Sequence, residues 1–242
     1  MRYGLISDIH GNLEALEAVL SEIDKLRVDQ ILCLGDVIGY GPNPTECVKI
    51  VRERTAVCLV GNHDEASLGR VDLEFFNYMA KEAIEWTTSR LASEAIEFLR
   101  TRPYTHEFED YVIVHATPED PRRWNYILSL DDAGQSFEAF DQQVCFIGHS
   151  HTPWVIDLDP DDHMRLRHDY PIKLQEQHRY LINVGSVGQP RDRNPAAAFA
   201  ILDSHKREYN LFRVPYNVVK TQMKIRAAGL PEFLADRLSV GQ

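Results

Sequence analysis

The amino-acid sequence predicts an α/β fold in which two sheets belong to one domain. In the first third of the 242 residues, short apolar runs alternate with segments of helical periodicity, and this order implies parallel strands joined by right-handed crossovers. The pattern from about residue 64 to residue 100 is mostly helical and contains no proline, whereas strand-like runs dominate from about residue 107 onward. Because no linker or repeat interrupts the chain, a single domain over residues 1–242 fits better than two.

The elements of the first third follow from apolar spacing. "RYGLIS" (2–7), "QILCLG" (30–35) and "AVCLVG" (56–61) are predicted strands. Apolar residues at helical spacing predict a helix over 13–26. A second helix is predicted to begin at Asn43-Pro44, where a capping residue precedes a proline at the first helical position.

The second half contains seven further strand-like runs, followed by a helical tail over residues 217–242. The break Gly229-Leu230-Pro231 in this tail indicates one helix end and one new start. The acidic stretch "DLDPDDH" lacks the glycine and glutamate of a calcium loop and is interpreted as a solvated hairpin turn. The runs are 110–116, 143–150, 153–159, 164–170, 180–186, 197–203 and 208–214.

Composition restricts the class of partner. Asp and Glu number 37 against 26 Lys and Arg, and the net charge of −11 argues against an extended nucleic-acid partner, although local basic clusters stay open. The four cysteines form no C-x-x-C pair, three lie in apolar runs, and we expect reduced thiols in a cytoplasmic protein. No signal peptide or membrane span is expected, because Asp8 interrupts the N-terminal apolar run and no run is long enough.

Polar residues of metal-binding type follow five of the predicted strands. In an α/β sheet, ligands gather at the carboxyl ends of strands, so these five segments are expected to converge on one rim. Taken singly each signal is weak, because a D-x-H after a strand is more often a cap and a turn, and a lone histidine is often a core residue. Together they offer oxygen and nitrogen ligands without cysteine, a set that suits manganese, iron or zinc. They are Asp8 and His10, Asp36, Asn62 and His63, His115, and His149 and His151.

The pair His149 and His151 lies in "FIGHSHTP". Side chains at i and i+2 of an extended segment point the same way, so both imidazoles are expected to face one object, with a metal as the first candidate.

Here the sequence resembles the calcineurin-like metallophosphoesterase superfamily, in its small bacterial and archaeal phosphodiesterase-like branch. The ordered motifs D-x-H, G-D, G-N-H-D/E, a lone histidine and G-H-x-H are matched by "DIH", "GD", "GNHD", "VHA" and "GHSH". "NVGSVGQPRD" (183–192) resembles a further segment of that branch. The resemblance implies two mixed β-sheets packed face to face, with helices on both outer faces and a dinuclear metal site on one rim.

The resemblance also implies a role for each matched residue. Asp8, His10 and His151 would hold one divalent ion and Asn62, His115 and His149 the other, with Asp36 bridging both. Manganese is the first expectation, with iron, zinc or nickel as alternatives. A water bridging the ions would become the attacking hydroxide. His63 would steady the phosphoryl oxygens and protonate the leaving oxygen, with Asp64 orienting its ring.

Departures from the family pattern bear on the substrate. Phosphoprotein phosphatases of the superfamily carry an arginine shortly after the bridging aspartate, but this chain reads "GDVIGYGPNP", which disfavours a phosphoprotein. Tyr40 and Asn43 in this loop are candidate substrate contacts, with a plain turn as the equal alternative. Arg191 is a candidate phosphate anchor, although a surface or ion-pairing role is favoured. "NVGSVGQPRD" either cradles phosphate through backbone amides or, as we favour, forms a turn that supports the metal rim.

The sequence therefore predicts a metal-dependent phosphoesterase acting on a small phosphodiester or nucleotide-type substrate. A phosphomonoesterase, a dinucleoside-polyphosphate hydrolase and a protein phosphatase are alternatives on the same site, and a metal-binding interaction scaffold is the alternative from another class. The oligomeric state stays open, because the segment 64–100 and the tail 217–242 can each cover an interface or cap the pocket.

Overall fold

The computed structural model describes all residues from Met1 to Gln242 and contains two mixed six-stranded sheets. The first sheet has the order β3-β2-β1-β11-β12-β9, and the second has the order β4-β5-β6-β10-β7-β8. The first comprises β1 (Arg2–Ile6), β2 (Gln30–Cys33), β3 (Val57–Cys58), β9 (Ile172–Lys173), β11 (Ala197–Asp203) and β12 (Glu208–Val214). The second comprises β4 (Thr105–Phe108), β5 (Tyr111–Val114), β6 (Val144–Ile147), β7 (Trp154–Leu158), β8 (Met164–Arg167) and β10 (Arg179–Asn183).

Both sheets combine parallel and antiparallel pairs. β1, β2 and β3 run parallel, as the β-α-β-α-β pattern predicts, while β11 pairs with β1 in the antiparallel sense. In the second sheet β6 is parallel to β5 and β10, and the pairs at both outer ends are antiparallel. The carboxyl ends of β1, β2, β3, β5 and β6 therefore reach the same rim.

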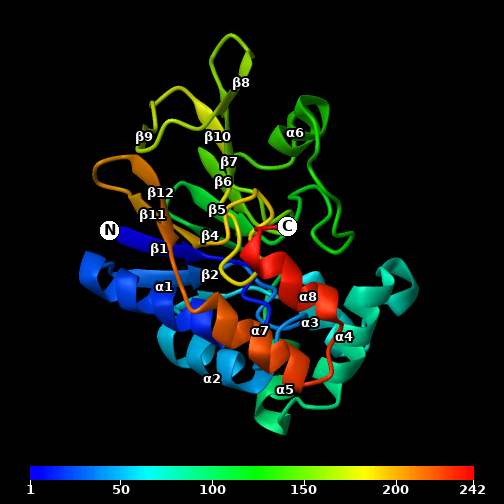
Figure 1. Cartoon of the computed structure of the whole chain (residues 1–242). Coiled ribbons are helices and arrows are strands. Elements are labelled where there is room, and N and C mark those ends of the chain that lie inside the picture. The colour runs from blue at the N-terminus through cyan, green and yellow to red at the C-terminus, as the bar shows by residue number, and fades with distance from the viewer.

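Helices cover the two outer faces, and the predicted fold class is confirmed. Figure 1 shows α1 (Leu13–Leu26) and α2 (Pro44–Arg54) on one side of the paired sheets and α6 (Leu130–Phe137) on the other. Strand alternation divides the core accordingly, because Leu5 of β1 packs between the sheets whereas Ile6 packs under α1 and α2. On the second sheet Val112 packs against α6, and its neighbour Ile113 faces the other sheet.

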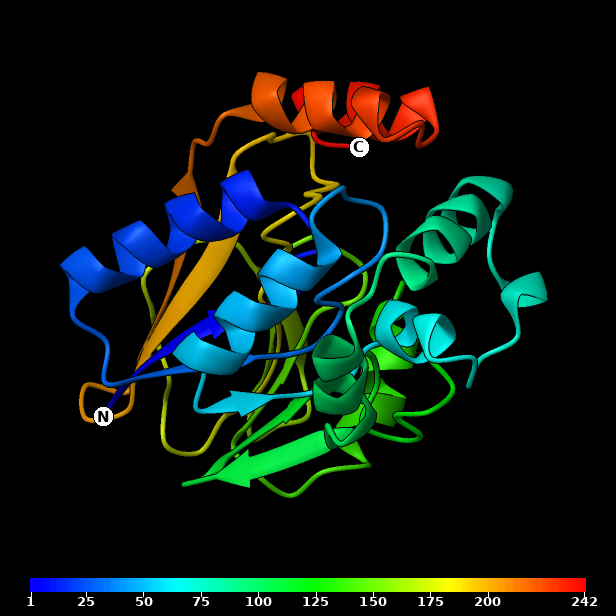
Figure 2. The same ribbon diagram turned by 90° about the horizontal axis from the view of Figure 1, so that it is seen from below.

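Both segments predicted to be helical, 64–100 and 217–242, contain helices. The first contains α3 (Asn62–Ser67), a 3-10 turn η1 (Leu73–Phe75), α4 (Tyr78–Thr88) and α5 (Ser93–Arg100). The tail contains α7 (Val218–Ala227), α8 (Glu232–Asp236) and η2 (Arg237–Ser239), with the predicted break between α7 and α8. Figure 2 shows α7 and α8 along the same side of the molecule as α1 and α2. The tail packs on Tyr40 and α4 in one apolar cluster.

Some predicted boundaries are wrong. The strand expected over 56–61 is only the two residues of β3, because the amide of Val60 leaves the sheet and donates to the carbonyl of Pro103 at 3.0 Å. β4, β9 and α6 were not predicted at all. No helix combines the length and apolar character needed to cross a membrane.

Candidate metal centre

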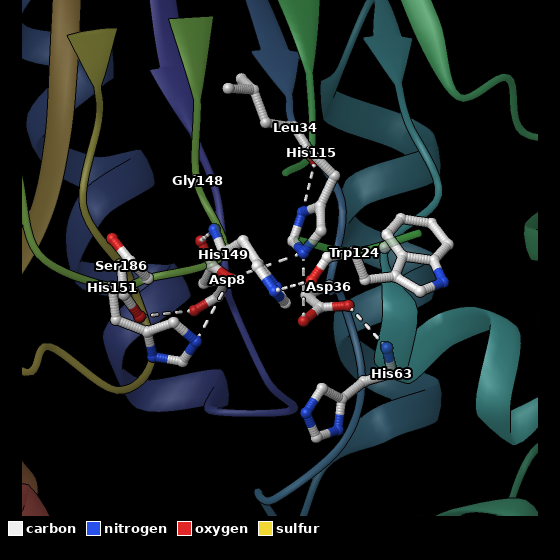
Figure 3. A network of polar contacts seen from close by, with 12 residues as sticks. Asp8, Leu34, Asp36, His63, His115, Trp124, Gly148, His149, His151 and Ser186 are labelled. Atoms are coloured by element: carbon white, nitrogen blue, oxygen red, sulfur yellow. Dashed lines mark hydrogen bonds and ion pairs between the residues drawn. The ribbon is translucent and has the colours of Figure 1, made fainter. Parts of the chain in front are cut away.

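All seven predicted ligands and His63 are buried on the common rim of the two sheets. Asp8 and His10 follow β1, Asp36 follows β2, and Asn62 and His63 begin α3 just after β3. His115 follows β5, and His149 and His151 follow β6. Figure 3 shows strands ending above Asp8, Asp36, His115, His149 and His151, with contacts that join Asp36 to His115 and Asp8 to His151.

The backbone of this rim is strained. Five of the seven residues have φ in the left-handed region, between 49° and 65°: Asp8, His10, Asp36, His149 and His151. Such values are uncommon for residues other than glycine and concentrate at functional sites. The expectation of an extended segment at His149 and His151 is therefore wrong. The two imidazoles diverge, His149 toward His115 and Asp36, and His151 toward His10 and Asp8.

Two groups of ligand atoms emerge, and Asp36 contacts histidines of both. His151 Nε2 lies 3.3 Å from Asp8 Oδ1, and His10 Nε2 lies 3.8 Å from the same oxygen. Asp36 Oδ2 lies 3.6 Å from His10 Nε2 and 3.4 Å from His115 Nε2. Within each group the ligand atoms lie no more than 4.8 Å apart. One group is Asp8, His10 and His151, and the other is Asp36, His115 and His149.

Backbone carbonyls fix the orientation of four histidines. One ring nitrogen of each lies within hydrogen-bond distance of a carbonyl, which in the neutral imidazole leaves the other nitrogen as an acceptor. The same arrangement orients metal-binding histidines generally. The pairs are His10 Nδ1 with Ile38 O (3.0 Å), His115 Nδ1 with Leu34 O (2.9 Å), His149 Nε2 with Trp124 O (2.9 Å) and His151 Nδ1 with Gln189 O (2.7 Å).

Several buried ligand atoms have no hydrogen-bond partner. Asp8 Oδ1, Asn62 Oδ1 and His115 Nε2 are inaccessible to solvent and unpaired within the protein. An unpaired buried polar atom is costly, so a native protein usually provides it with a partner. Buried oxygen and imidazole nitrogen atoms without a partner in the protein fit the ligand preferences of divalent cations, so these residues are suited to hold the metals that the family resemblance implies.

Burial and the two carboxylates set the charge states of the site. Burial lowers the pKa of His63 to about 4 and, with the nearby charge of His115, lowers that of His149 to about 3. Burial opposes the charged form of His115 too, but the carboxylate of Asp36 outweighs it and raises the pKa to about 10. The surrounding histidines hold the pKa values of Asp8 and Asp36 below their usual range despite burial.

His63 is held by aromatic packing, without help from Asp64. Its ring contacts Tyr40 (4.4 Å between centroids) and Phe76 (5.1 Å), and its Nδ1 has no hydrogen-bond partner. The carboxylate of Asp64 accepts instead from the backbone amides of Ile38 (3.1 Å) and Gly61 (3.0 Å). The expectation that Asp64 orients the His63 ring is therefore wrong, because this carboxylate ties together the two loops that carry Asp36 and Asn62.

The three candidate substrate contacts differ in their surroundings. Tyr40 is buried, and its ring packs on His10 and His63. Arg191 forms no ion pair; its guanidinium donates to Gln189 Oε1 at 2.8 Å and lies 5.8 Å from the ring centre of Tyr40. Asn43 accepts from Lys224 Nζ at 2.8 Å and donates to Glu46 at 3.0 Å. The side-chain oxygen of Asn43 thus links the start of α2 to α7, and its amide is held by Glu46 within α2, so neither polar group is free for a substrate.

The segment 183–192 supports the rim. The side-chain amide of Asn183 donates to the carbonyl of Gly148, and the hydroxyl of Ser186 donates to that of Asp8 at 2.8 Å. The backbone amides of Val187 and Gly188 donate to the carbonyls of Ser7 and Asp8, so they are not free to cradle a phosphate. This agrees with the interpretation as a supporting turn.

A cavity of about 790 Å³ opens beside the ligands. His63, Asn62 and His149 lie at its inner end, and Trp124 and Tyr126 form part of its wall. Trp124 contributes its carbonyl to His149 from a left-handed conformation (φ 57°), while the ring of Tyr126 stacks on His149 with 4.1 Å between centroids. Sequence reasoning missed both, because a backbone carbonyl leaves no signature in the sequence and no motif surrounds residues 124–126.

Fold and rim together define a calcineurin-like phosphoesterase. Residues 1–207 match the calcineurin-like phosphoesterase superfamily domain, and the chain belongs to this family of hydrolases of phosphate esters. A metallophosphoesterase from Sphaerobacter thermophilus is 42% identical, superposes with a TM-score of 0.89, and aligns over 100% of this chain and 99% of its own.

Two curated relatives extend the comparison. An uncharacterized protein of Methanocaldococcus jannaschii is 40% identical over 242 residues, which cover 98% of this chain and 97% of the relative. A symmetrical bis(5′-nucleosyl)-tetraphosphatase of Methylococcus capsulatus is 29% identical over 140 residues, covering 54% of this chain and 47% of the relative. The chain therefore matches about half of the tetraphosphatase.

Proposed function

We propose that this protein is a dinuclear metal-dependent phosphoesterase that hydrolyses a phosphodiester or nucleotide-type substrate. The observation that carries the proposal is the buried set of six carboxylate and imidazole ligands in two groups, which Asp36 connects through His10 and His115, together with the buried and unpartnered Oδ1 of Asn62. Asp8, His10 and His151 would hold one ion, and Asn62, His115 and His149 the other. Manganese is our first choice. Two divalent ions held there would neutralise charge on the phosphoryl group and make a water nucleophilic near neutral pH.

The protein's own groups would position and protonate the substrate. His63 lines the cavity beside the ligands, and its neutral ring would donate a hydrogen bond to a phosphoryl oxygen. To pass a proton to the leaving oxygen the ring would first be protonated, a state that the nearby phosphate anion would favour. Tyr40 and Phe76 would fix the plane of its ring. Arg191 has no carboxylate partner and would be available to the phosphate from the side of Tyr40. A dinucleoside polyphosphate is a second candidate substrate, supported by the name of the Methylococcus relative.

The test begins with protein stripped of metal by a chelator and reloaded with Mn²⁺. Hydrolysis of bis(p-nitrophenyl) phosphate is compared with that of the p-nitrophenyl monoester in wild type and His63→Ala, with the exposed His205→Ala as the matched control. We expect metal-dependent diester turnover that falls about 10²–10⁴-fold in His63→Ala and is unchanged in His205→Ala.

Metal stoichiometry completes the test, because the ring of His63 also lies near His10 and Asp36 and could itself be a ligand. If the His63→Ala variant still binds two ions per chain, His63 acts on the substrate. If the variant binds only one ion, His63 is a metal ligand and its proposed role is wrong. A wild type that binds two ions but hydrolyses neither ester would favour the scaffold alternative.

A further inference from the structure

An arginine-rich groove leads away from the candidate metal centre. The cavity that begins at His63 is continuous with a second one of about 480 Å³, since Arg70, Val71, Arg122 and Trp124 line both. Five arginines line the two cavities, whereas only two carboxylate residues do, in a chain whose net charge is −11. The arginines are Arg70, Arg100, Arg102, Arg122 and Arg123, and the carboxylates are Glu65 and Asp72.

Most of this positive charge is not neutralised within the protein. Arg70 pairs with the buried Glu65 at 2.9 Å, and Arg123 lies 3.6 Å from Asp120. Arg100, Arg102 and Arg122 take part in none of the ion pairs of the structure. The guanidinium of Arg102 donates to the carbonyl of Phe98 at 3.0 Å and to the hydroxyl of Thr101 at 2.9 Å, which leaves its charge without a carboxylate but fixes its position. Arg100 and Arg122 have no carboxylate either, and guanidinium groups favour bidentate contacts with phosphate.

The groove wall is anchored to the helix that carries His63. Glu65 of α3 accepts from Arg70 and from the hydroxyl of Tyr104, both at 2.9 Å. The guanidinium of Arg122 lies over the ring of Tyr104, 4.5 Å from its centroid. The ring of Trp124, which also lines the groove, lies 5.9 Å from the rings of Tyr104 and His115 between centroids. An anion bound at Arg122 would therefore be held in a fixed relation to the metal centre.

Exposed aromatic side chains line the cavity of about 790 Å³ that begins at His63. Phe75 is 85% exposed and Tyr126 is 48% exposed, although both are large and largely apolar. Exposed aromatic rings beside cationic groups are suited to stack on a planar base while the arginines contact phosphates.

We propose that this groove is a second substrate subsite, which binds a further phosphate of a nucleoside polyphosphate while the scissile phosphate lies at His63. The placement of the scissile phosphate at His63 rests on the proposed phosphoesterase function. The second phosphate lies at Arg122, Arg100 and Arg102, and the base stacks on Phe75 or Tyr126. The preferred substrate is then an ester with several phosphates and a base, in place of a simple diester.

Binding measurements test the subsite without requiring turnover. Calorimetry on Mn²⁺-loaded His63→Ala protein gives the Kd of diadenosine tetraphosphate, of inorganic tripolyphosphate and of adenosine monophosphate. Adding Arg122→Ala should weaken tetraphosphate and tripolyphosphate binding about tenfold each, the usual effect of losing one charged hydrogen bond, and affect the monophosphate less than about twofold. Arg122→Lys should give an intermediate loss, and Arg100→Ala should weaken the same two ligands.

The control is Arg52→Ala, which removes an exposed, unpaired arginine of α2 and should change no Kd. Phe75→Ala should weaken tetraphosphate binding but spare tripolyphosphate. Equal affinities in the parent and in both arginine variants would overturn the subsite, and loss confined to ligands with a base would show stacking without phosphate recognition. If wild type hydrolyses the diester but the arginine variants bind tetraphosphate and tripolyphosphate as the parent does, the proposed phosphoesterase function holds and the subsite is wrong. If the arginine variants bind these ligands more weakly but wild type hydrolyses no ester, the groove is a polyphosphate-binding site and the proposed phosphoesterase function is wrong.

Discussion

The Nε2 atoms of His10 and His151 lie 3.0 Å apart, and the Nδ1 atom of each ring is directed at a backbone carbonyl. If each Nδ1 donates its hydrogen to that carbonyl, both Nε2 atoms carry lone pairs and cannot bond to each other. Asp8 Oδ1 lies within 3.8 Å of both nitrogens. Three acceptor atoms thus crowd one point, an arrangement that a cation stabilises.

Metal should therefore raise thermal stability. At a free Mn²⁺ concentration of about 100 times Kd, binding adds about 2.7 kcal/mol per site, which corresponds to a rise in Tm of about 5–10 °C for a chain of this size. Differential scanning calorimetry of stripped and reloaded protein measures it. His151→Ala should lose about half of the total shift, the part due to the ion held by Asp8, His10 and His151, whereas the exposed His205→Ala should keep all of it. An equal shift in both variants would place the bound metal elsewhere.

Gly148 should tolerate no side chain. A Cβ at this position would lie 2.1 Å from Ser7 Oγ and 2.5 Å from Asp8 Oδ2, and the next amide, that of His149, donates to Asp8 Oδ2 at 3.0 Å. We expect Gly148→Ala to destabilise the fold by about 1–3 kcal/mol and to weaken metal binding. Chemical denaturation and metal titration give the two effects.

The matched control for this change is Gly134→Ala in α6. Its Cβ would meet only Met164 Cε, at 3.6 Å, so the variant should gain about 0.5–1 kcal/mol from a better helix former. If both alanine variants are equally stable, the close packing at Gly148 is not what holds Asp8.

Glu14 should contribute stability that depends on pH. Burial disfavours its charge, but Lys224 Nζ at 2.6 Å and Lys220 Nζ at 3.0 Å outweigh burial and lower the pKa of the carboxyl. Because folding lowers this pKa, the stabilisation is complete above the usual value and is lost as the pH falls through the lowered one. Glu14→Gln should therefore melt lower than wild type near neutral pH, and the difference should shrink as the pH falls below the usual carboxyl value of about 4.3.

Melting curves between about pH 3 and pH 7 measure the convergence. Glu17→Gln removes an exposed carboxylate from the same helix and should follow wild type throughout. A Glu14→Gln curve parallel to wild type at all pH values would mean that the two lysines do not stabilise the carboxylate.

The ligand positions could be predicted because each one follows a strand directly. Asp8, Asp36 and His115 come within three residues of a strand end, so strand order alone places them on one rim. The role of Asp64 could not be predicted, since its partners are backbone amides of two loops whose path the sequence does not specify. Roles that rest on the resemblance, including that of His63, remain predictions.

The missed elements have different causes. In α6 the apolar residues Leu130, Ala133 and Phe137 have helical spacing, and Ser129 with Asp132 forms a capping box, so a signal was present but was masked by Gly134 and the polar flanks. β9 has two residues and forms only because β12 pairs with it. The groove was missed because its arginines come from three separate stretches of the chain and match no motif.

The rim also constrains the order of folding. The hydrogen bond between the amide of His149 and Asp8 joins residues 141 positions apart, and it connects the loop after β6 in one sheet to the loop after β1 in the other. Contacts of such long sequence separation form late, because loop closure must precede them. Both sheets must consequently be in register before a complete ligand set exists. A nascent chain whose C-terminal half is still unsynthesised lacks His149 and His151, and the candidate metal centre is complete only after that half has joined the fold.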